Sequence, residues 1–410
     1  MPLQPDAGPS ELAEFGYKQE LNRTLSTTDL IVYGLVFMVP IAPWAIFGVV
    51  FNAASGMVPL VYLIGLVAMI FTALSYAQMS KAFPIAGSVY SYVGRALHPV
   101  LGFFAGWTIL LDYLLVPTLL YVFAAESMSG IFPGVPKPLW IIVFLIINTA
   151  INYVGISFTA IVNRLFLAAE LIFVVIFVIM AIVAISRGTN GAVFTTTPLF
   201  NADLFTPQLA AAALSIAVLS FLGFDGIATL SEEAKGGRRS AGIAMITGLV
   251  LVAVFFVTQT WLAAMLVPGT TQFGDDEVNN AFFGIVGKIS GSAWMVAFLA
   301  MNALAVGIAN AVAAQSATSR LLFSMSRDGR LPRFLAHIDP KSKAPQRAIL
   351  VVAGLTLVLG LVFVVLYLFV FFGAGAKGSF TDRLHPKLGL DLVGGTQATY
   401  QASLLSNGQA

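Results

Sequence analysis

The sequence predicts an all-α polytopic membrane protein, and three observations carry this prediction. Of the 410 residues, 58% are hydrophobic and only 10% are charged, whereas soluble domains carry about 25% charged residues. The apolar segments are long enough to cross a bilayer as helices. Two of these segments are interrupted near their middle by proline or glycine, in the stretches FMVPIAPWAIFG and SFLGFDG.

Nine apolar segments are expected to be transmembrane helices. They cover residues 29–52, 57–79, 99–125, 138–156, 161–186, 209–231, 241–267, 291–318 and 347–373. Between the seventh and the eighth, a polar stretch is followed by AFFGIVGKI. This weakly apolar stretch predicts a surface or re-entrant helix.

The distribution of lysine and arginine predicts a cytoplasmic N-terminus. With that orientation, 15 of the 21 basic residues fall in cytoplasmic segments and three, Lys137, Arg187 and Lys288, fall in external loops. Basic residues are enriched in cytoplasmic loops of membrane proteins. We therefore expect residues 1–28 to be a cytoplasmic segment of a multi-pass protein of the inner (plasma) membrane.

The two interrupted segments occupy corresponding positions of two halves. Pro40 and Pro43 remove hydrogen bonds from the first span, and Gly223 and Gly226 flank Asp225 in the sixth. The breaks lie about 180 residues and five spans apart, so the second half enters the membrane inverted relative to the first. Paired broken helices of this kind indicate the central binding site of a transporter.

Four further stretches carry a resemblance to a known family. They read FPIAGSVYSYVGRALHP, GWTILLDYLLVP, SFLGFDGIATLSEEAKGGRR and SRLLFSMSRDGRLPRFLAHIDP. Between residues 25 and 360 the chain thus resembles the amino acid–polyamine–organocation (APC) superfamily of permeases, of the bacterial amino acid or putrescine type. The resemblance implies a LeuT-like five-plus-five inverted repeat, with residues 29–187 as the first repeat, 188–208 as an external loop and 209–365 as an incomplete second repeat.

The end of the chain departs from that family pattern. Residues 366–410 resemble the start of the SecD subunit of the bacterial protein-export translocase: the end of a span and an extracytoplasmic tail. We expect a fusion or truncation after about nine helices, without the family's helices 10 to 12. A Sec accessory fragment is accordingly one alternative function.

The break in the sixth span is expected to bind substrate. Gly223 and Gly226 allow the backbone to leave helical geometry, which membrane proteins tolerate where the backbone lines a cavity. The unwound turn offers N–H groups and carbonyls, and Asp225 adds a negative charge. Phe221 and Phe224 are candidate pocket aromatics. The alternative reading is that Asp225 only caps the helix break and that the aromatic rings only pack.

The matching break in the first span supplies the other half of the expected site. Its candidate residues are Pro40, Ile41, Ala42 and Trp44. Neither Pro40 nor Pro43 has an N–H group to offer a substrate carboxylate. This favours an amine-type ligand, which Trp44 could also stack against. A plain proline kink is the alternative.

Two further carboxylates lie within spans. Asp112, in the third span, is expected to bind substrate, with a structural hydrogen bond as the alternative. By the resemblance, Glu170 in the fifth span stands where proton-coupled relatives have a titratable group, so it is expected to carry the coupling proton; a structural role is again the alternative. The eighth span has Asn302 and Asn310 at a two-turn interval, but no serine–threonine pair in mid-span for sodium.

The charged residues at the cytoplasmic end of the sixth and eighth spans are expected to form gate salt bridges or a solvated face. They include Glu232, Glu233, Arg320 and Arg327. A faint likeness of LDY and GFDG to intramembrane aspartyl proteases makes Asp112 and Asp225 a candidate catalytic pair, but the flanking residues do not match that family.

Composition narrows the function further. The chain has no cysteine, its three histidines lie outside the apolar runs, and no P-loop occurs, so no metal, cofactor, nucleotide or nucleic-acid partner is expected. The expected partners are the lipid bilayer and a small-molecule substrate. The sequence thus predicts not an enzyme but a secondary active transporter that imports an amino acid or a polyamine such as putrescine, coupled to protons.

Overall fold

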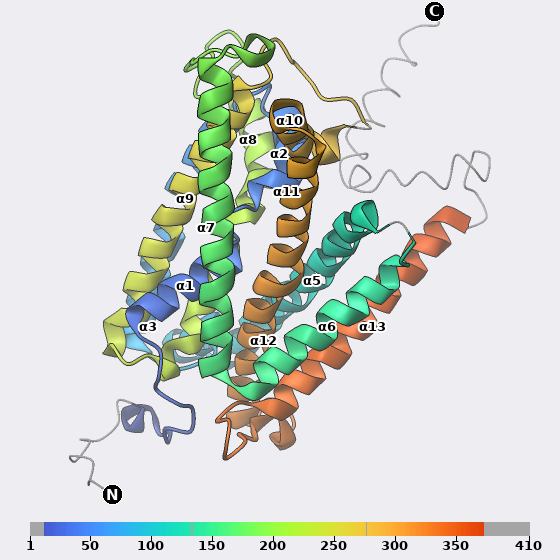
Figure 1. Cartoon of the computed structure of the whole chain (residues 1–410). Helices are drawn as coiled ribbons and strands as arrows, with labels where there is room; N and C mark the ends of the chain where they lie inside the picture. Colours follow the sequence, from blue (N-terminus) through green and yellow to red (C-terminus); the bar gives the residue numbers. More distant parts are fainter. Residues whose placement is uncertain (1–11, 133, 276, 373–410) are drawn as a thin grey trace, which may run out of the picture. The chain divides into compact units, whose positions relative to one another are not determined.

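The computed structural model describes residues 12–132, 134–275 and 277–372, and helices dominate this part of the chain (Figure 1). Seven helices are long and apolar enough to span a membrane, and a bent pair makes an eighth span. The straight spans include α3 (Val58–Ala82), α5 (Pro99–Ile131), α6 (Lys137–Val154), α7 (Ile156–Ser186) and α9 (Ser240–Met265). The predicted all-α membrane architecture is confirmed.

The bent pair is the first predicted span. Helix α1 (Thr27–Met38) begins with a capping box in which the Ser26 side chain accepts from the Asp29 backbone and the Asp29 side chain accepts in return. It ends before Pro40, and α2 (Pro43–Ala53) starts with proline at its first position, where the missing N–H costs no bond. The span bends by 54° between the two helices, so the predicted break is present.

The sixth predicted span is also interrupted. Helix α8 (Pro207–Ala217) passes into a 3₁₀ turn, η3 (Val218–Phe221), and a longer 3₁₀ segment, η4 (Phe224–Glu233), follows the break. Gly223 lies between them at φ +113°, a backbone conformation that favours glycine. The predicted discontinuity of this span is therefore confirmed.

The eighth predicted span contains a feature that the sequence did not predict. Helix α11 (Ser292–Leu304) and helix α12 (Ala311–Arg327) are joined by a π-helical turn, η7 (Ala305–Asn310), in which every residue is buried. The whole span runs from Ser292 to Arg327, nine residues beyond the predicted end at 318.

Two short helices connect the spans. Helix α10 (Ala281–Ser290) forms where a surface or re-entrant helix was predicted, and it packs against α2, α7 and α11. Helix α4 (Ser88–Ala96), between α3 and α5, was not predicted. Helix α13 (Gln346–Phe372) coincides with the ninth predicted segment, and its residues 346–360 are apolar.

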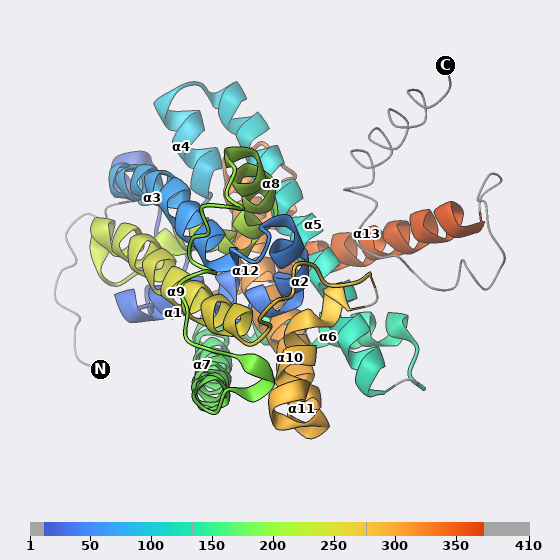
Figure 2. The ribbon, with the colours of Figure 1, turned by 90° about the horizontal axis from the view of Figure 1, so that it is seen from above.

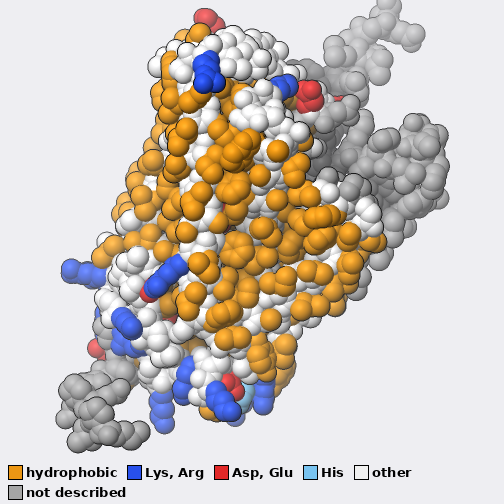
Figure 3. All heavy atoms as spheres, in the orientation of Figure 1, with side chains coloured by type: hydrophobic (Ala, Val, Ile, Leu, Met, Phe, Trp, Pro, Cys, Tyr) orange, Lys and Arg blue, Asp and Glu red, His pale blue; other side chains and the backbone are white. Residues whose placement is uncertain are grey.

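The broken spans occupy the interior of the helical bundle. Helix α1 contacts α7, α9, η4 and η7, and Figure 2 shows α1, α2 and α12 with α3, α7 and α9 around them. The long helices expose apolar side chains such as Ile172, Val175 and Ile179 of α7. Hydrophobic side chains dominate the face in Figure 3, and lysine and arginine gather near the N-terminal end of α7. This pattern suits a lipid-facing surface.

The chain divides into two compact units, residues 1–358 and 359–410. The second unit begins within α13, and the site described below lies wholly in the first. The predicted boundary between permease and SecD-like sequence at 365 and 366 stays a prediction. Most of the predicted SecD-like region, residues 373–410, lies outside the described residues.

Candidate functional site

The two helix breaks contact each other through the ring of Phe37. A Cβ atom on Gly226 would lie 2.3 Å from Cε1 of Phe37, and one on Gly223 would lie 2.8 Å from its Cγ. Phe37 belongs to the last turn of α1 before the break. Glycine therefore serves two purposes in the sixth span: Gly223 adopts the positive φ, and Gly226 leaves space for the ring.

The break in the first span is centred on Val39. This residue has φ +55°, which is strained for a β-branched side chain, and it precedes Pro40, whose ring disfavours helical geometry at the preceding residue. Gln259 of α9 holds the break: its Nε2 donates to the Pro40 carbonyl at 3.0 Å, and its Oε1 accepts from Trp44 Nε1 at 2.6 Å. Strain fixed by surrounding contacts is common at functional sites.

Asp225 is buried at the start of η4 and is bound by a tyrosine from α5. The Tyr113 hydroxyl donates to its Oδ2 at 2.6 Å. The phenol groups of Tyr33, Tyr76 and Tyr92 also lie close enough to Asp225 for electrostatic interaction. Four helical segments thus place tyrosines around one carboxylate, and Phe37 packs against Tyr33 and Tyr113 at centroid distances of 6.0 and 5.9 Å.

Asp112 is half-buried and does not share the hydrogen bond of its neighbour Tyr113. Successive residues on a helix point about 100° apart, so one of this pair faces Asp225 and the other does not. The two aspartates still interact electrostatically. The direct contact with Asp225 therefore comes from Tyr113, and the role of Asp112 in the site stays a prediction.

The remaining candidates fall into two groups. Phe224 packs on Tyr76 at 5.8 Å, next to Asp225. Phe221 packs on Tyr62 and Phe256 at 6.0 and 5.3 Å. In the first span, Pro40, Ile41 and Trp44 are buried and Ala42 is partly buried; Trp44 stacks on Phe282 of α10 at 5.0 Å and lies 4.9 Å from Phe298 of α11. The structure thus brings Phe224 to Asp225 and places Trp44 in an aromatic cluster beyond the break.

Glu170 is fully buried on α7, and neither of its carboxylate oxygens has a hydrogen-bond partner among the described residues. Phe173, one turn further on, packs on Phe298 at 5.2 Å. Asn302 lies one turn beyond Phe298 on the antiparallel α11, and its Oδ1 also has no partner in the described part of the chain. Buried polar groups without partners are rare and call for an explanation, so Glu170 and Asn302 are candidate functional groups of this region.

The eighth span contributes Asn310 to the same region. Its Nδ2 donates to the carbonyl of Phe37, while its Oδ1 is buried without a partner among the described residues. The Ser316 hydroxyl accepts from Arg320, and that of Thr318 donates to the Ala314 carbonyl at 2.7 Å. Within residues 12–372, apart from the two gaps, no group of three or more acidic or histidine side chains could hold a metal ion.

Two buried ion pairs close the end of the sixth span beyond Asp225. Glu233 pairs with Arg320, and Glu232 pairs with Arg327 at 2.6 Å. The side chains of the two glutamates are at most 1% exposed. The charges predicted as gate salt bridges or a solvated face therefore form buried pairs that join η4 to α12.

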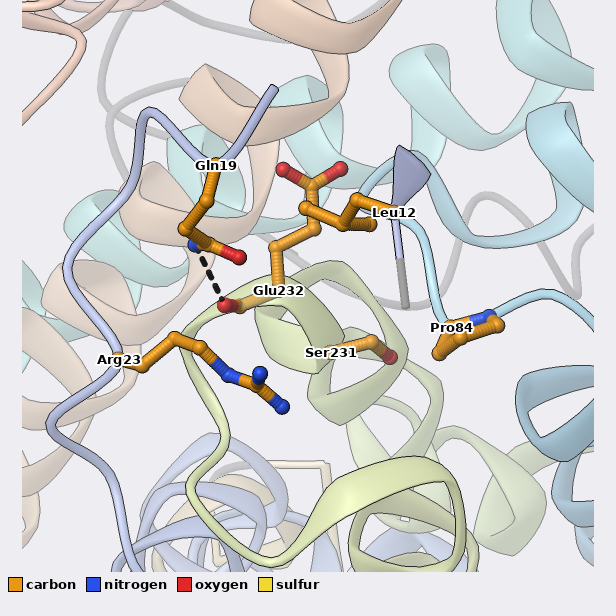
Figure 4. A pocket seen from close by; sticks show the side chains of 6 residues that line it. All are labelled: Leu12, Gln19, Arg23, Pro84, Ser231 and Glu232. Carbon is orange, nitrogen blue, oxygen red and sulfur yellow. Dashed lines mark hydrogen bonds between the residues drawn. The ribbon is translucent and has the colours of Figure 1, made fainter. Parts of the chain in front are cut away.

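The N-terminal segment covers these pairs. Gln19 donates to the Glu232 carbonyl at 3.1 Å and, with Leu12, Arg23, Pro84 and Ser231, lines a shallow depression around it (Figure 4). The centroid of the Tyr17 ring lies 3.9 Å from Cζ of Arg327, and the Tyr17 hydroxyl donates to Oδ1 of Asp328 at 2.5 Å. Burial, followed by the bond to Asp328, raises the pKa of the Tyr17 phenol. Ion pairs, hydrogen bonds and a cation–π contact therefore cover this end of the sixth span.

Several residues of the site were not predicted from the sequence. Phe37, Gln259 and the tyrosines around Asp225 look like ordinary components of apolar helices. A usable signal existed for Gln259, because a lone amide in the run VLVAVFFVTQTWLAAM needs a partner in the membrane. Phe37 had no such signal, because its role depends on two glycines 186 and 189 residues away.

Residues 24–381 match the family model described as amino acid permease. A low-affinity putrescine importer of Escherichia coli, PlaP, is 29% identical over 340 residues, which are 82% of this chain and 74% of the importer. The branched-chain amino acid permease BcaP of Bacillus subtilis is 24% identical over 350 residues, 80% of this chain and 72% of that protein. The family match continues past residue 366, and none of these relatives supports the SecD-like reading.

Two solved transporter structures share the fold. Mhp1, a nucleobase-cation-symport-1 family transporter in a closed conformation, superposes with a TM-score of 0.56 at 14% identity and covers 84% of this chain and 74% of its own. MhsT in complex with L-phenylalanine superposes with a TM-score of 0.56 at 16% identity, and the match covers 83% of this chain and 79% of the MhsT chain. The LeuT-like fold is confirmed, and the matched family consists of transporters rather than proteases.

Proposed function

Because this chain belongs to the amino acid permease family, we propose that it imports a small organic amine, a polyamine of the putrescine type or an amino acid, across the cytoplasmic membrane. The substrate binds between the broken first and sixth spans. Alternating access would then expose this site to each side of the membrane in turn. The secondary transporter class follows from the family; the substrate, the coupling ion and the orientation are parts of the proposal.

The buried carboxylate of Asp225 is the observation that carries the substrate class. It lies at the break of the sixth span, where the Tyr113 hydroxyl donates to one oxygen and the carboxylate charge acts on the phenols of Tyr76 and Tyr92. An ammonium group is attracted both to a carboxylate in a low dielectric and to aromatic faces. The site is therefore suited to a cation.

A diamine suits the site better than an amino acid. The carboxylate of an amino acid needs N–H donors, and two prolines of the first break have none. A second ammonium group could instead meet the half-buried Asp112, on which the charge of Asp225 acts. The 29% identical putrescine importer supports this choice, whereas the amino acid permease BcaP supports the alternative.

A binding panel on the purified protein tests the substrate proposal. Putrescine, butylamine and leucine are each titrated against the wild type, Asp225→Asn and Asp112→Asn, with Asp203→Asn in the exposed loop as the control. We expect Asp225→Asn to abolish binding of both amines, and Asp112→Asn to weaken putrescine but not butylamine. Leucine binding with no amine binding would move the proposal to an amino acid substrate.

Proton coupling through Glu170 is the second part of the proposal. The carboxyl group on α7, fully buried and without a hydrogen-bond partner among the described residues, supports this role, because gaining and losing one charge there would bias the two access states differently. Glu170→Gln should keep substrate binding but make uptake into vesicles independent of a pH gradient, while Glu277→Gln in a loop behaves as wild type. Sodium-dependent uptake with an unchanged pH profile in Glu170→Gln would refute the assignment.

The proposed orientation has a cytoplasmic N-terminus. It is supported by the excess of basic residues in the segments assigned to the cytoplasm. The chain has no cysteine, so single substitutions report cleanly. Thr189→Cys should react with an impermeant maleimide in intact cells and Lys343→Cys should not; the reverse pattern would invert the topology.

A further inference from the structure

The π turn in the eighth span needs an external hydrogen-bond donor. A π turn inserts one residue into the helical hydrogen-bond ladder, so that a backbone carbonyl loses its regular partner. Here the donor comes from the fourth span: Nδ2 of Asn148 donates to the Gly307 carbonyl at 2.8 Å. Asn148 is 0% exposed. Without its side chain, the Gly307 carbonyl would lose this hydrogen bond, and an unpaired carbonyl is costly in the membrane.

Asn148 is itself held in place by a tyrosine. Its Nδ2 carries two N–H groups; one reaches Gly307, and the other donates to the Tyr121 hydroxyl of α5 at 2.8 Å. Both N–H groups of the amide are therefore used between two neighbouring helices, whereas its Oδ1 is buried without a hydrogen-bond partner among the described residues.

Gly307 allows the π turn to approach these helices closely. A Cβ atom at this position would lie 2.7 Å from Cβ of Ala124 and 3.2 Å from the ring of Phe144. The backbone of the eighth span thus packs directly on α5 and α6. Only this close approach brings the carbonyl within reach of Asn148.

The π turn ends at Asn310, which binds the first span. Asn310 donates to the carbonyl of Phe37, and the ring of Phe37 fills the space above Gly223 and Gly226. Removing the extra residue of a π turn would rotate the following helix by about 100° relative to the preceding one. Asn310 would then lose its position next to Phe37.

We propose that Asn148 is a positioning residue for the substrate site: by donating to Gly307 it maintains the π turn that presents Asn310 to the broken first span. Asn148 does not touch the substrate in this proposal. It acts through Asn310 and Phe37, so its effect on binding rests on the proposed function, whereas its effect on the π turn does not.

A second asparagine on the same helix provides a matched control. Asn152, one turn further along α6, donates to the Val312 carbonyl at 3.0 Å and to Oε1 of Gln315 at 2.9 Å. It joins the same two spans with the same chemistry, but its partners lie in the regular α12. Loss of Asn152 should therefore weaken helix packing without disturbing the π turn.

The test is a double-mutant cycle on the purified full-length protein. Asn148→Leu, Asn310→Ala, the double variant and Asn152→Leu are compared for putrescine affinity and for unfolding temperature. We expect each single change at Asn148 or Asn310 to weaken affinity about tenfold, and the double variant to bind no more weakly than Asn310→Ala alone. Asn152→Leu should bind within about twofold of wild type.

Multiplicative losses in the double variant, or wild-type affinity in Asn148→Leu, would overturn the proposal. If the wild type binds no amine, the proposed function fails, but the unfolding-temperature cycle still decides this inference. Non-additive shifts in unfolding temperature support it, and additive shifts refute it. If Asn148→Leu does not fold, Asn148→Ala is taken through the same cycle with the same criteria.

Discussion

Replacing Gly226 by alanine tests the contact between the two broken spans. The added methyl group would lie 2.3 Å from Cε1 and 2.6 Å from Cδ1 of the Phe37 ring, whereas ordinary contacts begin at 3.4 Å. The ring must therefore retreat by about 1 Å. It has little freedom to do so, because Tyr33 and Tyr113 pack on it and Asn310 holds its carbonyl.

The expected cost follows from this geometry. Overpacking a tight interior costs about 1–3 kcal/mol, and we expect the first span to move away from Asp225 to relieve it. If the same free energy appears in binding, amine affinity falls by about 5- to 150-fold. Unfolding temperature in detergent and putrescine titration measure the two effects separately.

Gly284→Ala is the matched control, because a Cβ atom at that helical glycine of α10 would meet no atom within 4 Å. Alanine there should leave binding unchanged and stability equal or slightly higher, since alanine favours helices over glycine by about 1 kcal/mol. If Gly226→Ala unfolds and binds like Gly284→Ala, the two breaks do not depend on this contact and the reasoning is wrong.

Three further changes have defined outcomes. Tyr113→Phe removes the 2.6 Å hydrogen bond to Asp225 and should cost about 1.5–3 kcal/mol of stability in a denaturation experiment; a cost no greater than that of an exposed Tyr153→Phe change would contradict the contact. Arg320→Met leaves the buried Glu233 carboxylate unpaired and should lower the free energy of unfolding by about 3–5 kcal/mol. The double variant Arg320→Met with Glu233→Gln should recover most of this stability; an equal loss in the single and the double variant would refute the pairing. In the loop before α13, the backbone hydrogen bond from Ser342 at 2.7 Å holds the pKa of Asp339 below its usual value. The loop contacts should therefore be intact above the ordinary carboxyl pKa near 4 and weaken as pH falls below it, so that the protection of the Ser342 amide relative to its intrinsic exchange rate falls in wild type but shows no such step in Asp339→Asn.

The sequence alone predicted the membrane class, the spans and the two breaks, because these depend on local properties. Apolar length gives the spans, and the proline pair at 40 and 43 and the glycine at 223 disfavour regular helix through local backbone geometry. The family resemblance then predicted the fold, and the family and structural matches bear it out.

Tertiary structure decided what the breaks contact. Of the adjacent Asp112 and Tyr113, the sequence favoured the charged residue, yet the hydroxyl of Tyr113 binds Asp225, because helix rotation chooses which of two neighbours faces the interior. Gly226 was predicted to unwind the backbone, and its decisive property is instead the space it leaves for Phe37.

The π turn of the eighth span shows the same limit most clearly. The run NALAVGIANAVAA reads as a regular apolar helix, and nothing local distinguishes a π turn from an α turn in it. What distinguishes it in the fold is Asn148, more than 150 residues earlier, which donates to the Gly307 carbonyl within the π turn. Local sequence determined where this protein crosses the membrane and where its helices break; contacts between distant helices determined which side chains meet at the breaks.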